Sequence, residues 1–373
     1  MNRIIAAIRA ALTVAAIAPG VVTALAGSRD AADGPPHTAG PVVQPAIVTE
    51  RVPTDSDDPA IWVHPDDPAR SLIIGNDKND PGGLYVFDLD GRILPEKTVT
   101  GLRRPNNVDI EYGLVLGGEP VDVVVTTERY EHQLRVFSLP DMTPVDGGGL
   151  AVFVAETGAG YRLPMGIALY RRPDDGAVFA IVGRKSGPRQ GYLWQYRLED
   201  DGTGRVAATL VREFGTFSGT GEIEAIAVDD VLGYVYCSDE AAGIRKYHAD
   251  PADGDEELAL FGTGDFAEDR EGICIYPTGE TAGYILVSDQ QANGFNLYPR
   301  QGAPGEPHRH ELVGRVTVAA NESDGSEASA VAFNDTFRHG LFVAMSDERT
   351  FHFYRWEDIA EGALGVESAA IGE

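Results

Sequence analysis

A layout of roughly fifty residues recurs six times along this chain of 373 residues, and it restricts the possible folds more than any other feature. Each unit opens with a short apolar strand, passes through a turn rich in Asp, Gly or Pro into a β-branched strand, and closes with a third strand. The units begin near Asp57, Asn107, Met165, Glu222, Asp269 and Ala328. With almost no amphipathic helix between them, these units predict an all-β fold, a six-bladed β-propeller with one blade per unit. A pair of β-sandwiches would not produce six equivalent units.

The last unit is short of an outer strand, and its opening strand is predicted at residues 330–333. Residues 46–52 precede the first unit and need a partner for their apolar side. We therefore expect this N-terminal strand to close the ring. The sequence predicts one propeller domain over residues 46–362 and a C-terminal tail over 363–373.

The N-terminal residues are typical of a secretory signal. Arg3 and Arg9 precede an apolar run, and the small-residue sequence Ala24-Leu25-Ala26 follows a Pro-Gly break. The run is short for a membrane-spanning helix. These features predict a signal peptide over residues 1–26, a flexible Gly-, Ala- and Pro-rich leader over 27–45, and a secreted, extracellular protein without stable membrane insertion.

The cysteine content leaves two interpretations open. The chain contains only Cys237 and Cys274, which lie in successive units. An exported protein permits a disulfide between them. Two small buried strand residues explain the same pattern, because cysteine is common inside β-structure.

The charge balance restricts the partners. The chain has 58 acidic and 30 basic residues and a formal net charge of -28 at pH 7. Such an excess of acids argues against nucleic-acid binding and favours a partner that is cationic or bridged by metal.

Acidic residues recur where the predicted strands begin and end. Asp55, Asp57 and Asp58 stand directly before the first apolar strand, and carboxylates this close repel one another unless a cation lies between them. In a propeller, equivalent strands end on the same face, so these side chains should gather there. Oxygen ligands without His or Cys suit calcium. Basic residues end the second strands of the first three units, and bases facing acids would suit a polyanion bridged by calcium.

Two segments resemble the signature motifs of a known family. Asp57-Asp58-Pro59-Ala60-Ile61-Trp62 and Asn106-Asn107-Val108-Asp109-Ile110 are similar to motifs of the β-propeller phytases, calcium-dependent phosphatases that act on inositol hexakisphosphate (phytate). The resemblance extends from about residue 47 to about residue 360 and implies several calcium ions at one mouth of the propeller channel. The metal ligands that we expect are Asp57, Asp58, Glu224, Glu240, Asp269, Glu271, Gln290 and Asp324. The residues that we expect to bind phosphate are Lys78, Arg129, Arg184 and Lys185.

The chain departs from the family pattern at several of these positions. Asp77-Lys78 stands where the family has a lysine pair, and Met165 stands where it has a tyrosine. The family's lysine in the third blade is matched by Arg184, or by Lys185 after a shift of one residue. The acidic run near Asp324 is thinned. These departures bear on the substrate more than on the fold or the metal.

The sequence therefore predicts an extracellular, monomeric phosphatase of the 3-phytase type that takes a small phosphorylated substrate. We expect Asp58, Glu224 and Glu271 to hold the calcium ions that activate a water for attack on phosphorus. Two alternatives remain: a phosphodiesterase or other phosphoester hydrolase on the same face, and a non-catalytic calcium-stabilised propeller that binds a polyanion or a protein. A lactonase-like propeller is disfavoured because the acids are distributed unevenly among the units.

Overall fold

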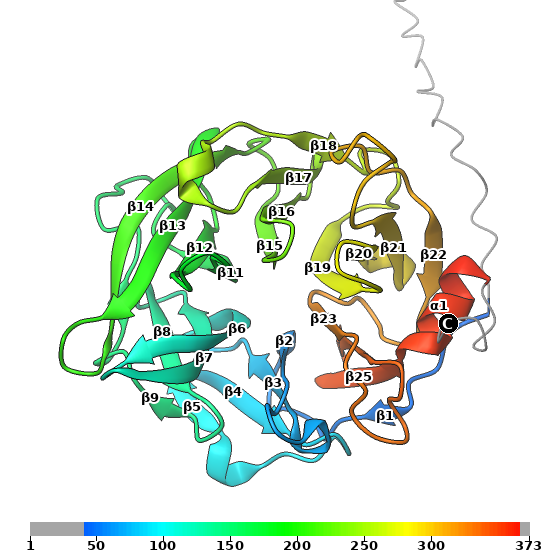
Figure 1. Cartoon of the computed structure of the whole chain (residues 1–373), viewed down its shortest axis with the longest axis horizontal. Coiled ribbons are helices and arrows are strands. Elements are labelled where there is room, and N and C mark those ends of the chain that lie inside the picture. Colours follow the sequence, from blue (N-terminus) through cyan, green and yellow to red (C-terminus); the bar gives the residue numbers. More distant parts are fainter. Residues whose placement is uncertain (1–40, 366–373) are drawn as a thin grey trace, which may run out of the picture. The chain divides into compact units, whose positions relative to one another are not determined.

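The computed structural model describes residues 41–365, which form six antiparallel sheets around a central axis (Figure 1). The first blade consists of β2 (Ser56–Trp62), β3 (Leu72–Asp77), β4 (Gly82–Phe87) and β5 (Val99–Leu102). The second consists of β6 (Pro105–Leu116), β7 (Glu119–Glu128), β8 (Gln133–Ser138) and β10 (Leu150–Ala151), with β9 (Thr143–Pro144) also paired to β8. The third consists of β11 (Pro164–Arg171), β12 (Val178–Arg184), β13 (Gln190–Asp200) and β14 (Val206–Thr216).

The other three blades follow the same plan. Their strands are β15 (Ile223–Asp229), β16 (Tyr234–Asp239), β17 (Gly243–His248) and β18 (Ala259–Phe261); β19 (Arg270–Pro277), β20 (Gly283–Asp289), β21 (Gly294–Pro299) and β22 (Gly314–Thr317); and β23 (Ser326–Ser329), β24 (Leu341–Ser346), β25 (Thr350–Arg355) and β1 (Ile47–Val48). The first strand of each blade lies nearest the axis (Figure 1). The predicted six-bladed propeller is confirmed.

The valine run in β7 shows how the sequence produces blade packing. Successive side chains of a strand point to opposite faces of the sheet. Val123 and Val125 pack with residues of the third blade, whereas Val124 packs with residues of the first, and all three are fully buried. A strand covered on both faces has no polar side, which explains the continuous β-branched run. Each such side chain contributes about 1.5–3 kcal/mol through burial.

The ring closes through its N-terminal strand, as predicted. β1 pairs antiparallel with β25, with Ile47 opposite Phe353 and Val48 opposite His352. The backbone N–H of Ala46 donates to the carbonyl of Phe353 at 2.8 Å. The sixth blade is thus built from residues near both ends of the described chain.

The inner strand of the sixth blade is not where the sequence placed it. The prediction of residues 330–333 is wrong, because β23 occupies Ser326–Ser329 and its Glu327 lies opposite Val343 of β24. Residues 330–333 instead leave the sheet, and the N–H of Phe333 donates to the carbonyl of Phe337 at 3.0 Å. Both phenylalanines are buried in the core near the ring closure. The apolar side chains of Val331 and Phe333 pack in this core, while β23, the strand beside the channel, carries polar residues.

A helix and the cysteines complete the fold. Helix α1 (Trp356–Leu364) follows β25, and its Trp356 stacks on Tyr276 with ring centroids 3.4 Å apart.

Cys237 and Cys274 are free thiols buried in β16 and β19, as expected of small strand residues. The predicted signal peptide and most of the leader and tail lie outside the described residues. Within residues 41–365, no helix is long and apolar enough to cross a membrane.

Two carboxyl groups lie together near the channel end at which the inner strands finish. Burial raises the pKa of Glu111 to about 8 and that of Asp230 to about 7, and Asp230 raises the pKa of Glu111 further. The facing groups are Asp109, which raises both pKa values, and Arg171, which lowers them. Because folding raises these pKa values, the stability that the pair contributes is present at acidic pH and is lost as the pH rises through them.

Replacement of Glu111 by Gln removes one titrating group of this pair. We expect the melting temperature of the variant, measured at saturating calcium, to fall less than that of the wild type between about pH 5 and about pH 8.5. Glu119→Gln, at an exposed position of β7, serves as the control, and its melting temperature should depend on pH as that of the wild type does. Equal slopes for wild type and Glu111→Gln would contradict the assignment.

Candidate active site at the channel mouth

The polar residues gather at one mouth because of strand register. The end of the second strand lies opposite the start of the first strand in five blades, and each first strand then shifts register. The opposing pairs are Ser56 and Asp77, Pro105 and Glu128, Pro164 and Arg184, Ile223 and Asp239, and Arg270 and Asp289. Residues just before a first strand and just after a second strand therefore meet at the channel mouth, as the sequence predicted.

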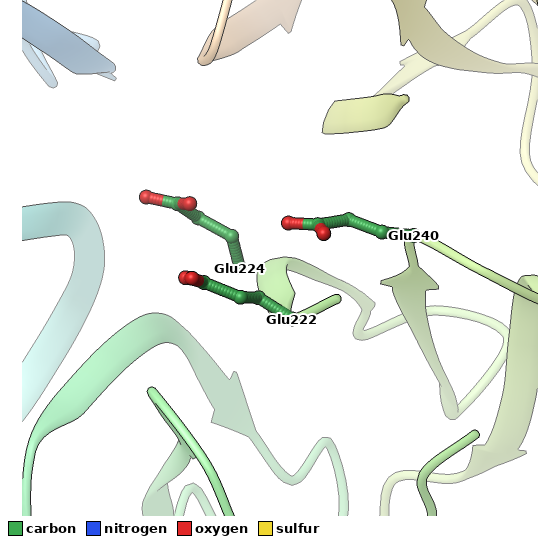
Figure 2. Close-up of side chains that lie close together, drawn as sticks. All are labelled: Glu222, Glu224 and Glu240. Carbon is green, nitrogen blue, oxygen red and sulfur yellow. The ribbon is translucent and has the colours of Figure 1, made fainter. Parts of the chain in front are cut away.

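Three glutamates of the fourth blade form the acidic centre of this mouth. One carboxylate oxygen each of Glu222, Glu224 and Glu240 lies within 4.8 Å of the other two, and Figure 2 shows the three side chains around one space. Glu222 and Glu224 are two residues apart at the start of β15 and so point the same way. Burial, then Glu224 and Asp269, raise the pKa of Glu240 to about 7.

Glu271 joins these acids from the fifth blade. It is 6% exposed, and burial raises its pKa well above the ordinary value. Glu224, Glu240 and Asp324 raise the pKa further, in that order of effect, which places carboxylates of the fourth and sixth blades around it. The structure therefore brings together the acids that the sequence assigned to the fourth, fifth and sixth blades.

Several acid oxygens in this region have no hydrogen-bond donor. Among the described residues, Asp57 Oδ2, Glu222 Oε2 and Glu271 Oε2 are buried without a partner. A buried, unpaired carboxylate oxygen is costly unless a cation or a proton compensates its charge. Carboxylate oxygens from several blades are the donor set that calcium prefers. The residues present therefore fit calcium.

Lys78 connects the first and sixth blades at the same mouth. Its Nζ lies 2.9 Å from Asp57 Oδ1 and 2.6 Å from Asp324 Oδ2. Burial raises the pKa of Asp324 to about 6, with Asp57 adding to the effect. Asp324 also accepts a hydrogen bond from Gln290 Nε2. Lys78 is thus placed beside two of the expected metal ligands.

Asp269 lies at the edge of the acidic cluster. Its backbone N–H donates to Gln291 Oε1 at 2.9 Å, and its carboxylate accepts from Gln291 Nε2 at 2.8 Å. Gln291 also donates to Gln290 Oε1 at 2.9 Å. Gln291 was not expected at the site from the sequence, although its position beside Gln290 was a signal for it.

Basic side chains of the second and third blades border the acidic cluster. Arg129 is 7% exposed, its Nη2 donates to Asn106 Oδ1 and contacts Met165 Sδ, and its Nε is buried without a partner. Lys185 forms an ion pair with Glu222, and burial followed by Arg129 lowers its pKa. Arg104 lowers the pKa of both Arg129 and Lys185 and so lies near them. Arg104 was not expected at the site from the sequence, although it lies two residues before the second motif.

Arg184 is held inside the third blade instead. It is fully buried and donates to Glu156 Oε1 at 2.7 Å and to the carbonyls of Tyr192 and Gly191 at 2.9 and 2.6 Å. Its guanidinium also lies 4.7 Å from the centre of the Phe153 ring. All three of its nitrogens have acceptors, so Arg184 has no nitrogen without a protein partner.

Asp58 points into the channel, away from the side on which its neighbour Asp57 lies. Its Oδ2 accepts from the N–H of Val108 at 3.1 Å, and it lines a channel cavity of about 130 Å³ with Asp109 and Glu327. Burial raises the pKa of Glu327 to about 8. Glu327 was missed because the sixth inner strand was placed four residues too late. The structure groups Asp58 with these channel acids and not with Glu224.

Comparison with known proteins identifies the family. A family model for phytase matches residues 10–364. The 3-phytase of Bacillus subtilis (strain 168) is 31% identical over 323 residues, which cover 82% of this chain and 80% of that protein. Among solved structures, the Dos1 propeller is 14% identical, with a TM-score of 0.45, and the match covers 82% of this chain and 68% of that chain. BBS1N in complex with ARL6DN is 11% identical, with a TM-score of 0.43, and the match covers 76% of this chain and 74% of that chain. These two likenesses carry no argument about function. The family model and the Bacillus relative show that the chain belongs to the phytase family.

Proposed function

We propose that this phytase is an extracellular, calcium-dependent enzyme that releases phosphate from phytate, with the 3-phosphate as its first target. The observation that supports calcium is the set of buried, unpartnered oxygens on Asp57, Glu222 and Glu271 beside further carboxylates. The target position follows from the similarity to the Bacillus 3-phytase.

The acidic and basic sides of the mouth have different tasks. Glu222, Glu224, Glu240, Glu271 and Asp324 would hold calcium, with Asp57, Asp269 and Gln290 at the rim of the cluster and Asp58 supporting it from the channel. Calcium held by these residues would supply positive charge to phosphate oxygens and would lower the pKa of a bound water. Arg129, Lys185 and Arg104 orient the phosphate groups through charge-assisted hydrogen bonds. Lys78 balances the charge of Asp57 and Asp324.

Phosphate release tests this proposal directly. Phytate, a phosphodiester and a simple phosphomonoester are each incubated with the enzyme, with calcium and after chelation. The proposal predicts fastest release from phytate, loss of release on chelation, and recovery when calcium is restored. Equal activity with and without calcium would overturn the metal assignment, and faster hydrolysis of the phosphodiester would favour the alternative substrate class.

Lys185 and Arg184 are neighbours in the sequence, but we expect their alanine variants to lose different properties: activity in the first case and stability in the second. Lys185→Ala should lower kcat/KM for phytate roughly tenfold or more, the effect of losing one charge-assisted hydrogen bond, and should leave the melting temperature nearly unchanged. Arg184→Ala should destabilise the fold by about 3 kcal/mol, because it leaves the Glu156 carboxylate and two carbonyls without a donor. Thermal unfolding and steady-state kinetics well below the melting temperature separate the two effects. The reverse pattern would restore Arg184 as the phosphate-binding residue.

A further inference from the structure

Asn106 connects the acidic and basic sides of the mouth. It is fully buried at the start of β6 in the second blade. Its Nδ2 donates to Glu224 Oε1 of the fourth blade at 2.7 Å and to Asn107 Oδ1 at 2.8 Å. Its Oδ1 accepts from Nη2 of Arg129. One amide therefore contacts both an expected calcium ligand and the main expected phosphate-binding arginine.

The chemistry of the two partners determines the orientation of this amide. An arginine guanidinium has only donors, and an ionised carboxylate has only acceptors. The amide oxygen must therefore face Arg129 and the amide nitrogen must face Glu224. Neither an apolar side chain nor a carboxylate meets both requirements, and a buried group left without its partner loses about 1–3 kcal/mol.

The backbone holds Asn106 in place from the other side. The carbonyls of Pro105 and Asn106 accept hydrogen bonds from Nδ2 of Asn76 in the first blade. The Oδ1 of Asn76 in turn accepts from the N–H of Asp58 at 2.6 Å. Asn106 is thus fixed by its own strand and by the first blade, and its amide has little freedom to follow a partner that moves.

We infer that Asn106 is a positioning residue that sets Arg129 and Glu224 relative to each other, so that phosphate binding and calcium binding depend on one amide. The inference rests on the proposed function, since it takes the roles of Arg129 and Glu224 from there. Asn106 itself need not touch substrate. Its contribution acts through the two side chains that it holds.

Asn106→Ala should change two properties together. We expect kcat/KM for phytate to fall at least tenfold, and we expect the calcium concentration that gives half-maximal activity to rise severalfold. Asn106→Asp keeps the volume of the side chain and is the second test variant if the alanine variant folds poorly. It keeps an acceptor for Arg129 but removes the donor to Glu224, so kcat/KM should fall here also.

The chain offers a matched control in the fifth blade. Asn296 is 1% exposed, donates to the carbonyl of Asp265 at 3.0 Å and accepts from Arg315 Nε at 3.1 Å, so it makes the same kinds of contact away from the mouth. Asn296→Ala should lower the melting temperature without changing KM, kcat or the calcium requirement.

A double-mutant cycle separates positioning from a purely structural role. If Asn106 acts through Arg129, Asn106→Ala should lower kcat/KM much less in an Arg129→Ala background than in the wild type. An equal loss in both backgrounds, with an unchanged calcium requirement, would overturn the inference while leaving the proposed function standing. If Arg129→Ala and Glu224→Gln alone left phytate hydrolysis unchanged, the roles assigned to them would fail, and the inference with them.

Discussion

Chelation of calcium should lower the melting temperature of the enzyme by roughly 4 °C for each ion that was bound at a hundredfold excess over its Kd. Binding at that excess stabilises the folded state by about 2.7 kcal/mol per site, and a propeller of this size changes its melting temperature by roughly 1.5 °C per kcal/mol. Differential scanning calorimetry with calcium, with chelator and with magnesium measures the effect. Magnesium should substitute poorly because it requires a strict octahedron of short bonds.

Glu271→Gln should change the stability of the calcium-free protein and that of the calcium-bound protein in opposite directions. Without calcium the variant should be more stable than the wild type, because burial and the neighbouring acids make the Glu271 charge unfavourable. With calcium it should be less stable and at least a hundredfold less active, because a ligand charge is lost. Glu119→Gln, at an exposed position, should change neither form. A Glu271→Gln variant whose calcium response equalled that of the wild type would contradict the assignment of Glu271 as a ligand.

Arg129→Ala should lower kcat/KM for phytate roughly ten- to a hundredfold. A charge-assisted hydrogen bond is worth about 1.5–3 kcal/mol, and each 1.4 kcal/mol corresponds to a factor of about ten. Arg129→Lys keeps the charge but loses the planar fork, so it should lose less activity than the alanine variant. Steady-state kinetics at saturating calcium measures both.

The calcium response distinguishes Arg129 from the acidic residues. The calcium-dependent rise in melting temperature should persist in Arg129→Ala, because an arginine is not a metal ligand. If phosphate release were intact in Arg129→Ala while Glu271→Gln lost only stability, the acidic face would be structural. A non-catalytic calcium-stabilised propeller would then be the better interpretation.

The propeller was predictable because each blade repeats the same order of strands and turns, and because one edge of the last blade lacked a partner. The gathering of acids at the mouth followed from the same repeat, since equivalent strand ends share a face. The sixth inner strand was mispredicted because the apolar residues 330–333 pack in a core outside the sheet, while the true strand carries the polar Ser326 and Glu327. Local hydrophobicity does not distinguish these two kinds of burial.

The direction of individual side chains was harder to predict than their neighbourhood. Asp57 and Asp58 are adjacent, yet one meets Lys78 at the mouth and the other meets the N–H of Val108 in the channel. Arg184 and Lys185 differ in the same way, and only the aromatic and carbonyl contacts of Arg184 show that it is enclosed. A register difference of one residue reverses the face of a strand, and the sequence alone does not establish that register at an irregular strand end.

The closure of the ring by β1 has a consequence for how the protein folds. The N–H of Phe351 donates to Oγ1 of Thr49, a residue 302 positions away in the chain. Contacts between such distant residues form slowly because the intervening loop must lose its conformational freedom first. Five blades can assemble from neighbouring residues, but the sixth must wait for both ends. Until β1 arrives, the unpaired edge of β25 is open to the strand of another molecule, so the refolding yield should fall as protein concentration rises.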